Sequence, residues 1–397
     1  MKKVYLDYAA TTPVDKRVAK AMEPYISEKF GNTMSLHSFG QEAKFALDQS
    51  RQVLADVINA KPNEIILTGS ATESNNLAIK GIVFNMPKNR YARHIIISSI
   101  EHPCIMETAK WLSRGCKITK LPVDKYGMVD PKDVEREIRP DTILVSVIHA
   151  SNEIGTIQKI AEIGKICRER KVYFHTDASQ SFGKIPIDVK KMNIDLLTAS
   201  SHKIYGPKGA GLLYVREGIR LVPLLHGGGQ ENGLRSSTVN VPAIVGFAKA
   251  AELCQEEMKM EAKRLSKLRD KLIKGILKID GAKLNGPPSR KASAGQSHPN
   301  KLPGIINISF PYIEGESLII QLDMHGIACS TGSACSSMKL EPSYVLLAIG
   351  LKPEQAHGSL RVSLGRFTTE KEINYLLKVL PKIVKQLELM SPFKHAN

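Results

Sequence analysis

Two side chains in this sequence, Lys203 and Asp177, follow apolar runs that are typical of buried strands. Lys203 comes after residues 196–199 and before a turn rich in Gly and Pro. A lysine in a dry pocket has a lowered pKa and can form a Schiff base with an aldehyde. Asp177 follows residues 172–175, and a carboxylate there could hold a protonated pyridine nitrogen. Taken singly, each has an ordinary alternative, because Lys203 could be a surface lysine and Asp177 the cap of a helix.

Two further segments carry groups of a different kind. In the segment 68–75 a predicted strand ends at the first residue, and Ser70 and Glu73 have the spacing of a capping box at a helix start. Backbone N–H groups at such a start suit a phosphate, although a capped helix with no ligand would give the same pattern. The segment 329–337 is built of Ser, Thr, Gly and Ala around Cys335, which favours an exposed, mobile thiol.

Together these segments offer a helix start for a phosphate, an acid for a ring nitrogen, a lysine for an aldehyde and a mobile thiol. Pyridoxal phosphate needs the first three. Each segment follows a strand-like run, and open α/β sheets bind ligands beyond the carboxyl ends of their strands. The candidate strands are Ile65–Thr68, His94–Ser98, Thr142–Ile148, Val172–His175, Leu196–Ala199 and Gly211–Val215.

Several of these strands are continuous apolar runs, as expected for strands buried on both faces, and helical stretches such as Ile160–Arg170 supply the crossovers. We therefore predict an α/β fold with a mostly parallel sheet in a large domain, residues 13–260. A long, charged helix is expected at 248–277. A smaller C-terminal α/β domain, residues 261–397, should follow, with residues 1–12 packed on it.

The composition of the 397 residues, 42% hydrophobic and 24% charged, is ordinary for a globular protein. No apolar run is long enough to span a bilayer and the N-terminus shows no leader pattern, so we expect a cytoplasmic protein with no membrane association. The six cysteines form no C-x-x-C pair, which disfavours a zinc site. A net charge of +17 attracts phosphates, acidic proteins or RNA, but without a nucleic-acid-binding motif a solvated basic surface is the simpler interpretation.

Eight short motifs occur in the order found in one family. They are Ala71-Thr72-Glu73-Ser74, Glu101-His102, Asn152-Glu153-Ile154-Gly155, Asp177-Ala178-Ser179-Gln180, Ser200-Ser201-His202-Lys203, His226-Gly227-Gly228-Gly229-Gln230-Glu231, Arg235-Ser236-Ser237-Thr238 and Ser333-Ala334-Cys335. In this set the chain resembles the cysteine desulfurases of the NifS/IscS type, within class V of the fold-type I enzymes that use pyridoxal phosphate. The resemblance covers nearly the whole chain, from Tyr5 to Thr368.

The resemblance implies a role for each candidate residue. Lys203 would form the Schiff base with pyridoxal phosphate and move the Cα proton, while Asp177 would pair with the pyridine nitrogen. His102 would stack on the ring, Gln180 would hydrogen-bond the ring oxygen, and Cys335 would take the substrate sulfur as a persulfide and leave alanine. The other cofactor-binding residues would be Ala71, Thr72, Asn152, Ser200, Ser201 and His202, with Thr238 from the second subunit of a homodimer. Asn152 and Arg361 would bind the carboxylate of L-cysteine.

The Cys335 loop resembles that of the subgroup which delivers sulfur to scaffolds for iron–sulfur cluster assembly and to tRNA-thiolation proteins. No resident metal is expected, although Cys335 could transiently ligate an iron–sulfur cluster. The sequence departs from the family pattern at Thr33, Met34, Ser201 and Ser237, and these positions are expected at the rim of the pocket. Cys329, six positions before Cys335, ends an apolar stretch, which favours a packing role.

Two other functions remain open at this point. One is another class V enzyme, such as an aminotransferase or a selenocysteine lyase, although an aminotransferase would not need Cys335. The other is a basic protein that binds RNA or a scaffold and has lost catalysis. The presence of Lys203, Asp177, His102 and Cys335 argues against such a loss.

Overall fold

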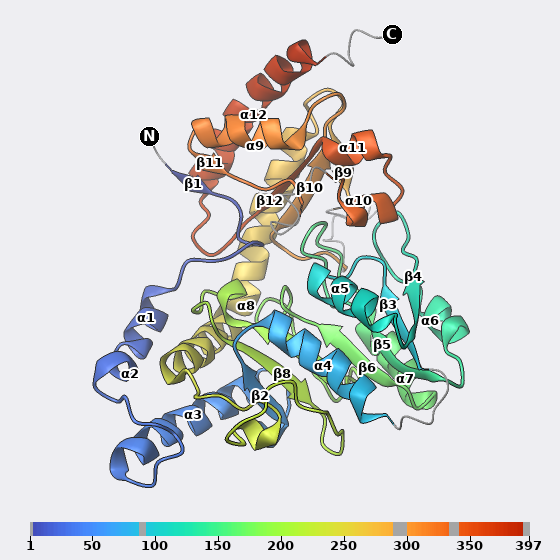
Figure 1. Ribbon diagram of the computed structural model, residues 1–397. Helices are drawn as coiled ribbons and strands as arrows, with labels where there is room; N and C mark the ends of the chain where they lie inside the picture. Colours follow the sequence, from blue (N-terminus) through green and yellow to red (C-terminus); the bar gives the residue numbers. More distant parts are fainter. Residues whose placement is uncertain (1–2, 87–92, 289–299, 333–340, 392–397) are drawn as a thin grey trace.

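The computed structural model describes residues 3–86, 93–288, 300–332 and 341–391 (Figure 1). Its largest sheet has seven strands in the order β2-β8-β7-β6-β5-β3-β4. β8 is antiparallel to both of its neighbours and the other pairings are parallel, which confirms the predicted mostly parallel sheet. The strands are β2 (Ile65–Thr68), β3 (His94–Ser98), β4 (Lys117–Leu121), β5 (Thr142–Ser146), β6 (Tyr173–Asp177), β7 (Leu196–Ser200) and β8 (Gly211–Val215).

Helices cover both faces of this sheet, so its central strands are buried throughout their length. On one face, α4 (Ala71–Asn85) and α5 (Pro103–Leu112) pack their apolar side chains on the sheet. The other face is covered by α1 (Lys16–Met22), α3 (Ser38–Asp56), α6 (Pro131–Glu137), α7 (Ile160–Glu169) and the first half of α8 (Val241–Ile276). The short helix α2 (Pro24–Ser27) lies between α1 and α3 in the chain.

A second hydrophobic core forms around the last part of α8. It contains an antiparallel sheet in the order β12-β10-β9 and a parallel pair of β1 with β11. These strands are β1 (Val4–Tyr5), β9 (Lys283–Asn285), β10 (Ile305–Ser309), β11 (Ile327–Ala328) and β12 (Ser359–Ser363). The helices of this region are α9 (Gly315–Met324), α10 (Tyr344–Ala348), α11 (Pro353–His357) and α12 (Glu370–Met390).

The 36-residue helix α8 belongs to both cores, and the expected domain boundary at residue 260 lies within it (Figure 1). Its residues up to Cys254 pack in the first core, and Leu272 to Ile276 pack in the second. Near the N-terminus, Val4 and Leu6 are buried in the second core. We propose that these cores are two domains that share α8 and that the N-terminal segment completes the smaller one. Among the described residues, no helix is long and apolar enough to cross a membrane.

Candidate active site

A cavity of about 230 Å³ lies where the strands β2, β3, β5, β6 and β7 end. This is the edge at which α/β sheets bind ligands. The predicted site residues that line it are Ala71, Thr72, His102, Asn152, Asp177, Gln180, Ser200, His202, Lys203 and Arg361. Residues from six separate segments of the chain therefore meet in one space. The lining also includes Ser70 and Ser179 from the predicted segments, and Ala9, Ala10, Cys104 and Ile148, for which the sequence had indicated no role in a pocket.

Lys203 is the last residue of a short 3-10 turn, Ser201–Lys203, that directly follows β7. Its Nζ donates hydrogen bonds to the backbone oxygens of Ala9, at 2.8 Å, and Ala10, at 2.7 Å. The lysine is therefore held against the N-terminal segment, which closes this side of the cavity. Since both partners are backbone groups about 190 residues away in sequence, no side-chain pattern could have revealed them.

Asp177 is the last residue of β6 and is 4% exposed. One carboxylate oxygen accepts from Asn75 Nδ2 at 2.7 Å, and the other accepts from the backbone N and Oγ of Ser179, at 2.9 and 2.6 Å. An ionised carboxylate has about four lone-pair positions, so it can still accept from one further donor in the cavity. Asn75 is a residue that the sequence analysis missed. It lies one turn into α4 as a fully buried polar side chain, and a buried amide of this kind needs a partner.

The start of α4 forms another wall of the cavity. Ser70 caps this helix, and its Oγ accepts from the backbone N of Glu73 at 3.2 Å. The Glu73 side chain accepts from Gly69 N at 2.8 Å and pairs with Arg235 at 2.7 Å, so the second half of the expected capping box is displaced by one residue. The first N–H groups of a helix have no intrahelical acceptor and face an anion favourably.

Two histidines on the cavity wall are held neutral by burial. His102 caps α5, and its Nδ1 accepts from the backbone N of Cys104 at 3.3 Å. Burial lowers the pKa of His102, and the nearby Asp177 only partly offsets this effect. Burial, followed by the positive charge of Lys203, lowers the pKa of His202 to about 4. Its Nδ1 lies 3.0 Å from Thr11 Oγ1. Because both rings are neutral, the positive charge in the cavity comes from Lys203 and Arg361.

Arg361, in β12, brings a guanidinium from the second core into this cavity and is 1% exposed. Its Nη2 donates to Asp7 at 2.9 Å and its Nη1 to the backbone oxygen of Asn152 at 3.2 Å. Its Nε is buried and has no acceptor among the described residues. An unsatisfied buried donor is costly, so a carboxylate that entered here would find a ready partner.

Three of the predicted site residues lie elsewhere. Ser201 is fully buried outside the cavity lining, and its Oγ has no hydrogen-bond partner among the described residues. A side chain at Gly206 would come within 2.1 Å of that oxygen, so Ser201 is packed in the interior rather than at the rim. Thr238 is exposed and does not line the cavity of its own chain, and its proposed role is in a second subunit. Cys335 lies outside the described residues.

The five cysteines that the structure describes share one property. Burial raises the pKa of each thiol, to about 11 for Cys254 and about 12 for Cys104, and upward also for Cys116, Cys167 and Cys329. Thiols of this kind stay protonated and unreactive near neutral pH. Within the described ranges, no group of three His, Cys, Asp or Glu side chains is arranged to hold a metal ion.

Comparisons with known proteins agree with this arrangement. The model of the aminotransferase class-V family matches residues 4–376. The chain is 50% identical to cysteine desulfurase IscS of Dictyoglomus turgidum over 99% of its length and 97% of the relative's. It is 51% identical to cysteine desulfurase IscS of Methanosarcina thermophila, over 98% and 94%. A solved structure titled NifS-like protein superposes with a TM-score of 0.89 at 38% identity, over 97% of this chain and 100% of the other. The chain belongs to the cysteine desulfurases of the class V aminotransferase family.

Proposed function

We propose that this enzyme uses pyridoxal phosphate to take the sulfur from L-cysteine, leaving alanine and a persulfide on Cys335. The observation that carries the proposal is the single cavity that joins Lys203, Asp177 and Arg361 to the start of α4. These groups supply an amine, an acid, a carboxylate partner and an anion-binding helix end in one buried space. Within a family of cysteine desulfurases, this set fits an amino-acid substrate and a phosphorylated cofactor.

The chemistry of the lining fits pyridoxal phosphate residue by residue. Lys203 would bind its aldehyde, Asp177 its pyridine nitrogen and Gln180 its ring oxygen, while His102 would cover the ring. The phosphate would be held by Ala71, Thr72, Ser200 and His202, and by Thr238 from a second copy of the chain. Once bound, the cofactor draws electrons from the substrate Cα.

The remaining steps belong to side chains of the protein. Arg361 and Asn152 orient the substrate by its carboxylate, and the planar guanidinium fixes the carboxylate's direction as well as its place. Lys203, released by the substrate amine, moves the Cα proton. The Cys335 thiolate attacks the substrate sulfur, so that an S–S bond forms as the C–S bond breaks and the three-carbon product is protonated to alanine. The high pKa values of the five described thiols support Cys335 as this nucleophile, because none of them is poised as a thiolate.

The experiment that tests this function is a product assay. The purified protein loaded with pyridoxal phosphate should convert L-cysteine to alanine and, with a thiol reductant present, to an equal amount of sulfide. An aminotransferase of the same family would instead need a 2-oxo acid and release no sulfide. Amino transfer without sulfide, or no product from cysteine, would overturn the proposal.

Asp177 should act on the cofactor's electronics rather than on the fold. Asp177→Asn keeps the shape but not the anion, so we expect cofactor to bind while exchange of the substrate Cα proton slows by at least about 100-fold. Exchange into D₂O, followed by NMR, measures this. Asn75→Ala is the matched control, because it removes the 2.7 Å hydrogen bond to Asp177 and keeps the carboxylate. Equal slowing in the two variants would mean that packing, not charge, is responsible.

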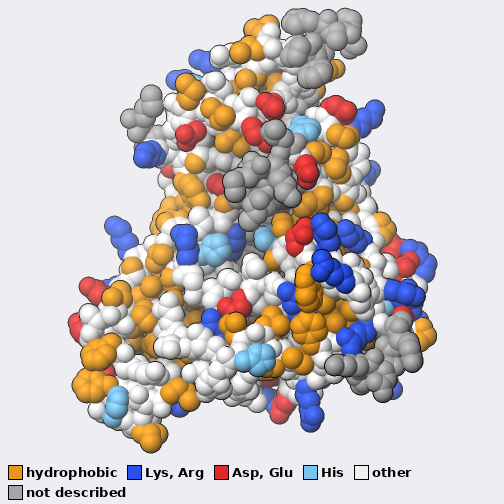
Figure 2. Space-filling view, viewed as in Figure 1, with side chains coloured by type: hydrophobic (Ala, Val, Ile, Leu, Met, Phe, Trp, Pro, Cys, Tyr) orange, Lys and Arg blue, Asp and Glu red, His pale blue; other side chains and the backbone are white. Residues whose placement is uncertain are grey.

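The enzyme should be a homodimer, and an exposed apolar patch supports this proposal. Ile26, Phe30, Leu36, Phe39 and Phe45 are between 53% and 93% exposed on and around α2 and α3. Hydrophobic side chains gather over this region at the lower left of Figure 2. Apolar patches on this scale mark interaction sites, and we propose that a second copy of the chain covers this one.

We expect Leu36→Glu combined with Phe39→Glu to shift the protein to monomers in sedimentation velocity and to weaken cofactor binding. The control is Leu389→Glu, at a 65% exposed position of α12, which should leave the dimer intact. A double variant that stays dimeric would place the interface elsewhere.

As partners we propose an iron–sulfur scaffold and tRNA-thiolation proteins, whose affinity for the basic surface should fall with ionic strength.

A further inference from the structure

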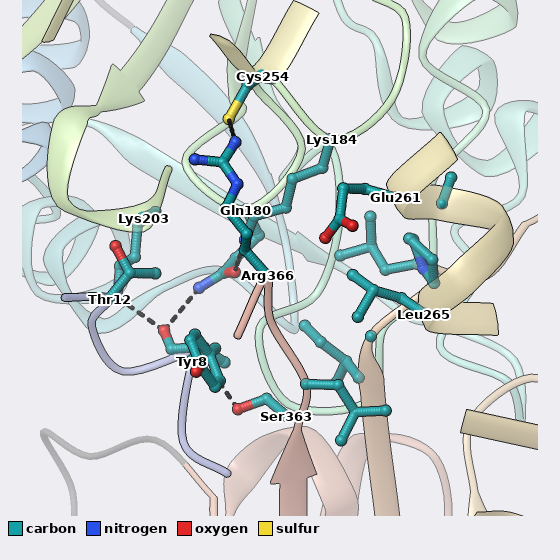
Figure 3. Close-up of a pocket in the computed structure, with 18 of the residues that line it drawn as sticks. Tyr8, Thr12, Gln180, Lys184, Lys203, Cys254, Glu261, Leu265, Ser363 and Arg366 are labelled. Carbon is teal, nitrogen blue, oxygen red and sulfur yellow. Dashed lines mark hydrogen bonds between the residues drawn. The ribbon is translucent and has the colours of Figure 1, made fainter. Parts of the chain in front are cut away.

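A second cavity, of about 60 Å³, is lined by Gln180 together with residues of α8 and of the second core (Figure 3). The two cavities share Ala9, Gln180 and Lys203 in their linings, so this part of the wall separates them. The second cavity lies between α8 and the strands of the second core, with Leu265, Leu302, Ile305 and Leu364 among its apolar walls. It also contains a lysine, Lys184, to which the proposed reaction assigns no task.

Lys184 is connected to the cofactor cavity through Gln180. Its Nζ donates to Gln180 Oε1 at 3.1 Å, and Gln180 Nε2 donates to the backbone oxygen of Ala9 at 2.8 Å. The same Ala9 oxygen accepts from Lys203 Nζ at 2.8 Å. Gln180 itself is 4% exposed, so water has little access to its amide. Three hydrogen bonds thus join the lysine in one cavity to the lysine in the other.

The two ends of the Gln180 amide are similar in size but opposite in function, because one end donates and the other accepts. An oxygen of the cofactor ring needs the donating end. An ammonium group has three donors and no acceptor. Of the two ends of the Gln180 amide, therefore, only the oxygen can form a hydrogen bond with Lys184. If the amide turned over, its oxygen would face the Ala9 oxygen and its NH₂ group would face the ammonium. Both contacts would then be repulsive.

We propose that Lys184 is a positioning residue that fixes the Gln180 amide with Nε2 available to the cofactor. The proposal rests on the proposed function, because Gln180 matters to the reaction only if it meets the cofactor ring. It assigns to the second cavity the task of holding a cation behind the cofactor site. Lys184 does not line the first cavity, so it would act through Gln180 rather than by contact with the cofactor or the substrate.

The surroundings of Lys184 keep it a donor at neutral pH. The ionisable groups that share its cavity are Tyr8, Lys203, Cys254, Tyr205, Glu257, Glu261 and Arg366. Glu257 is paired with Arg17 and Arg366, and Glu261 with Arg264, so the carboxylates have cations of their own. Burial, and then the charge of Lys203, lowers the pKa of Lys184 to about 8. Below that pH it is an ammonium that cannot accept a hydrogen bond.

The test follows the absorption of bound pyridoxal phosphate against pH. A donor at the ring oxygen stabilises the deprotonated form of the link between Lys203 and the aldehyde, and so holds its titration midpoint low. Lys184→Met should free the amide and raise the midpoint by about one pH unit, the value of one hydrogen bond to a charged group. Lys184→Arg keeps an obligate donor and should stay near the parent. Lys191→Met, at an 86% exposed side chain, is the matched control and should not change the midpoint.

A double-mutant cycle separates positioning from a direct effect of charge. In a Gln180→Leu background, Lys184→Met should shift the midpoint by much less than it does alone, since the residue through which it acts is gone. A full shift in that background, or no shift in the single variant, would overturn the proposal. If the Lys184→Met variant does not bind pyridoxal phosphate, the titration midpoints of the Lys184→Gln and Lys184→Arg variants are compared instead. Failure of the parent to bind cofactor or desulfurate cysteine would instead count against the proposed function.

Discussion

Replacing Lys203 with arginine should abolish desulfuration while leaving the protein folded. Arginine can still donate to the backbone oxygens of Ala9 and Ala10 that Lys203 reaches at 2.8 and 2.7 Å, but it has no primary amine to bind an aldehyde. Loss of both the cofactor link and the general base should reduce the rate by at least about 10³-fold. Borohydride reduction followed by peptide mass spectrometry measures the link directly, as pyridoxyl mass on the peptide that contains Lys203.

Two comparisons sharpen this prediction. Lys203→Ala removes the same amine but also leaves the two backbone oxygens without their donor, so the difference in melting temperature between the variants reports the structural part of the role. Lys191→Ala, at an exposed side chain, should keep full labelling and activity. A reducible adduct on another lysine of the parent, Lys184 above all, would show that the assignment is wrong.

The second large effect is expected at Cys335. Cys335→Ser should still load cofactor and bind cysteine, yet its sulfide release should fall to background and no persulfide should form. Cys329→Ala should keep most of the activity, because Cys329 is 9% exposed in the second core and burial raises the pKa of its thiol. Its substitution should cost stability rather than turnover.

Mass spectrometry after a single turnover with L-cysteine distinguishes these roles. A mass increase of about 32 Da, which corresponds to one sulfur atom, should appear on the peptide that contains Cys335 and on no other. A relay in which Cys329 resolves the persulfide would instead give a disulfide between the two cysteines. Sulfur on Cys329 in the Cys335→Ser variant would defeat the prediction.

The central sheet could be predicted because most of its strands are recognisable in the sequence as short apolar runs. Residues 94–98 and 196–200 are short apolar runs, and both lie fully buried in the sheet. β4 was missed because Lys117–Leu121 is an edge strand with exposed lysines, so its apolar content is low. The pairing of β1 with β11 could not be predicted, for a different reason. Each strand has two residues, and neither segment indicates which distant part of the chain it pairs with.

The candidate site also contains residues that the sequence identifies and residues that only the structure reveals. Lys203, Asp177 and His102 are side chains of characteristic type at strand ends or helix caps, and they could be found by motif. The Ala9 and Ala10 oxygens could not, because every residue carries a backbone carbonyl and only the fold selects these two. Lys184 and Asn75 act on other site residues rather than on a ligand, so their significance appears only when the hydrogen-bond partners are known.

The pairing of β1 with β11 also affects how this enzyme is made. On the ribosome, Val4 emerges long before Ile327, its partner in the sheet. At bacterial and eukaryotic elongation rates the interval is roughly 20 to 60 s. Throughout that time the N-terminal strand has no edge to join, and the Ala9 and Ala10 oxygens lack the support of the second core. The nascent chain therefore cannot complete its lysine pocket until almost all of it has been synthesised, and products that terminate before residue 327 should be inactive.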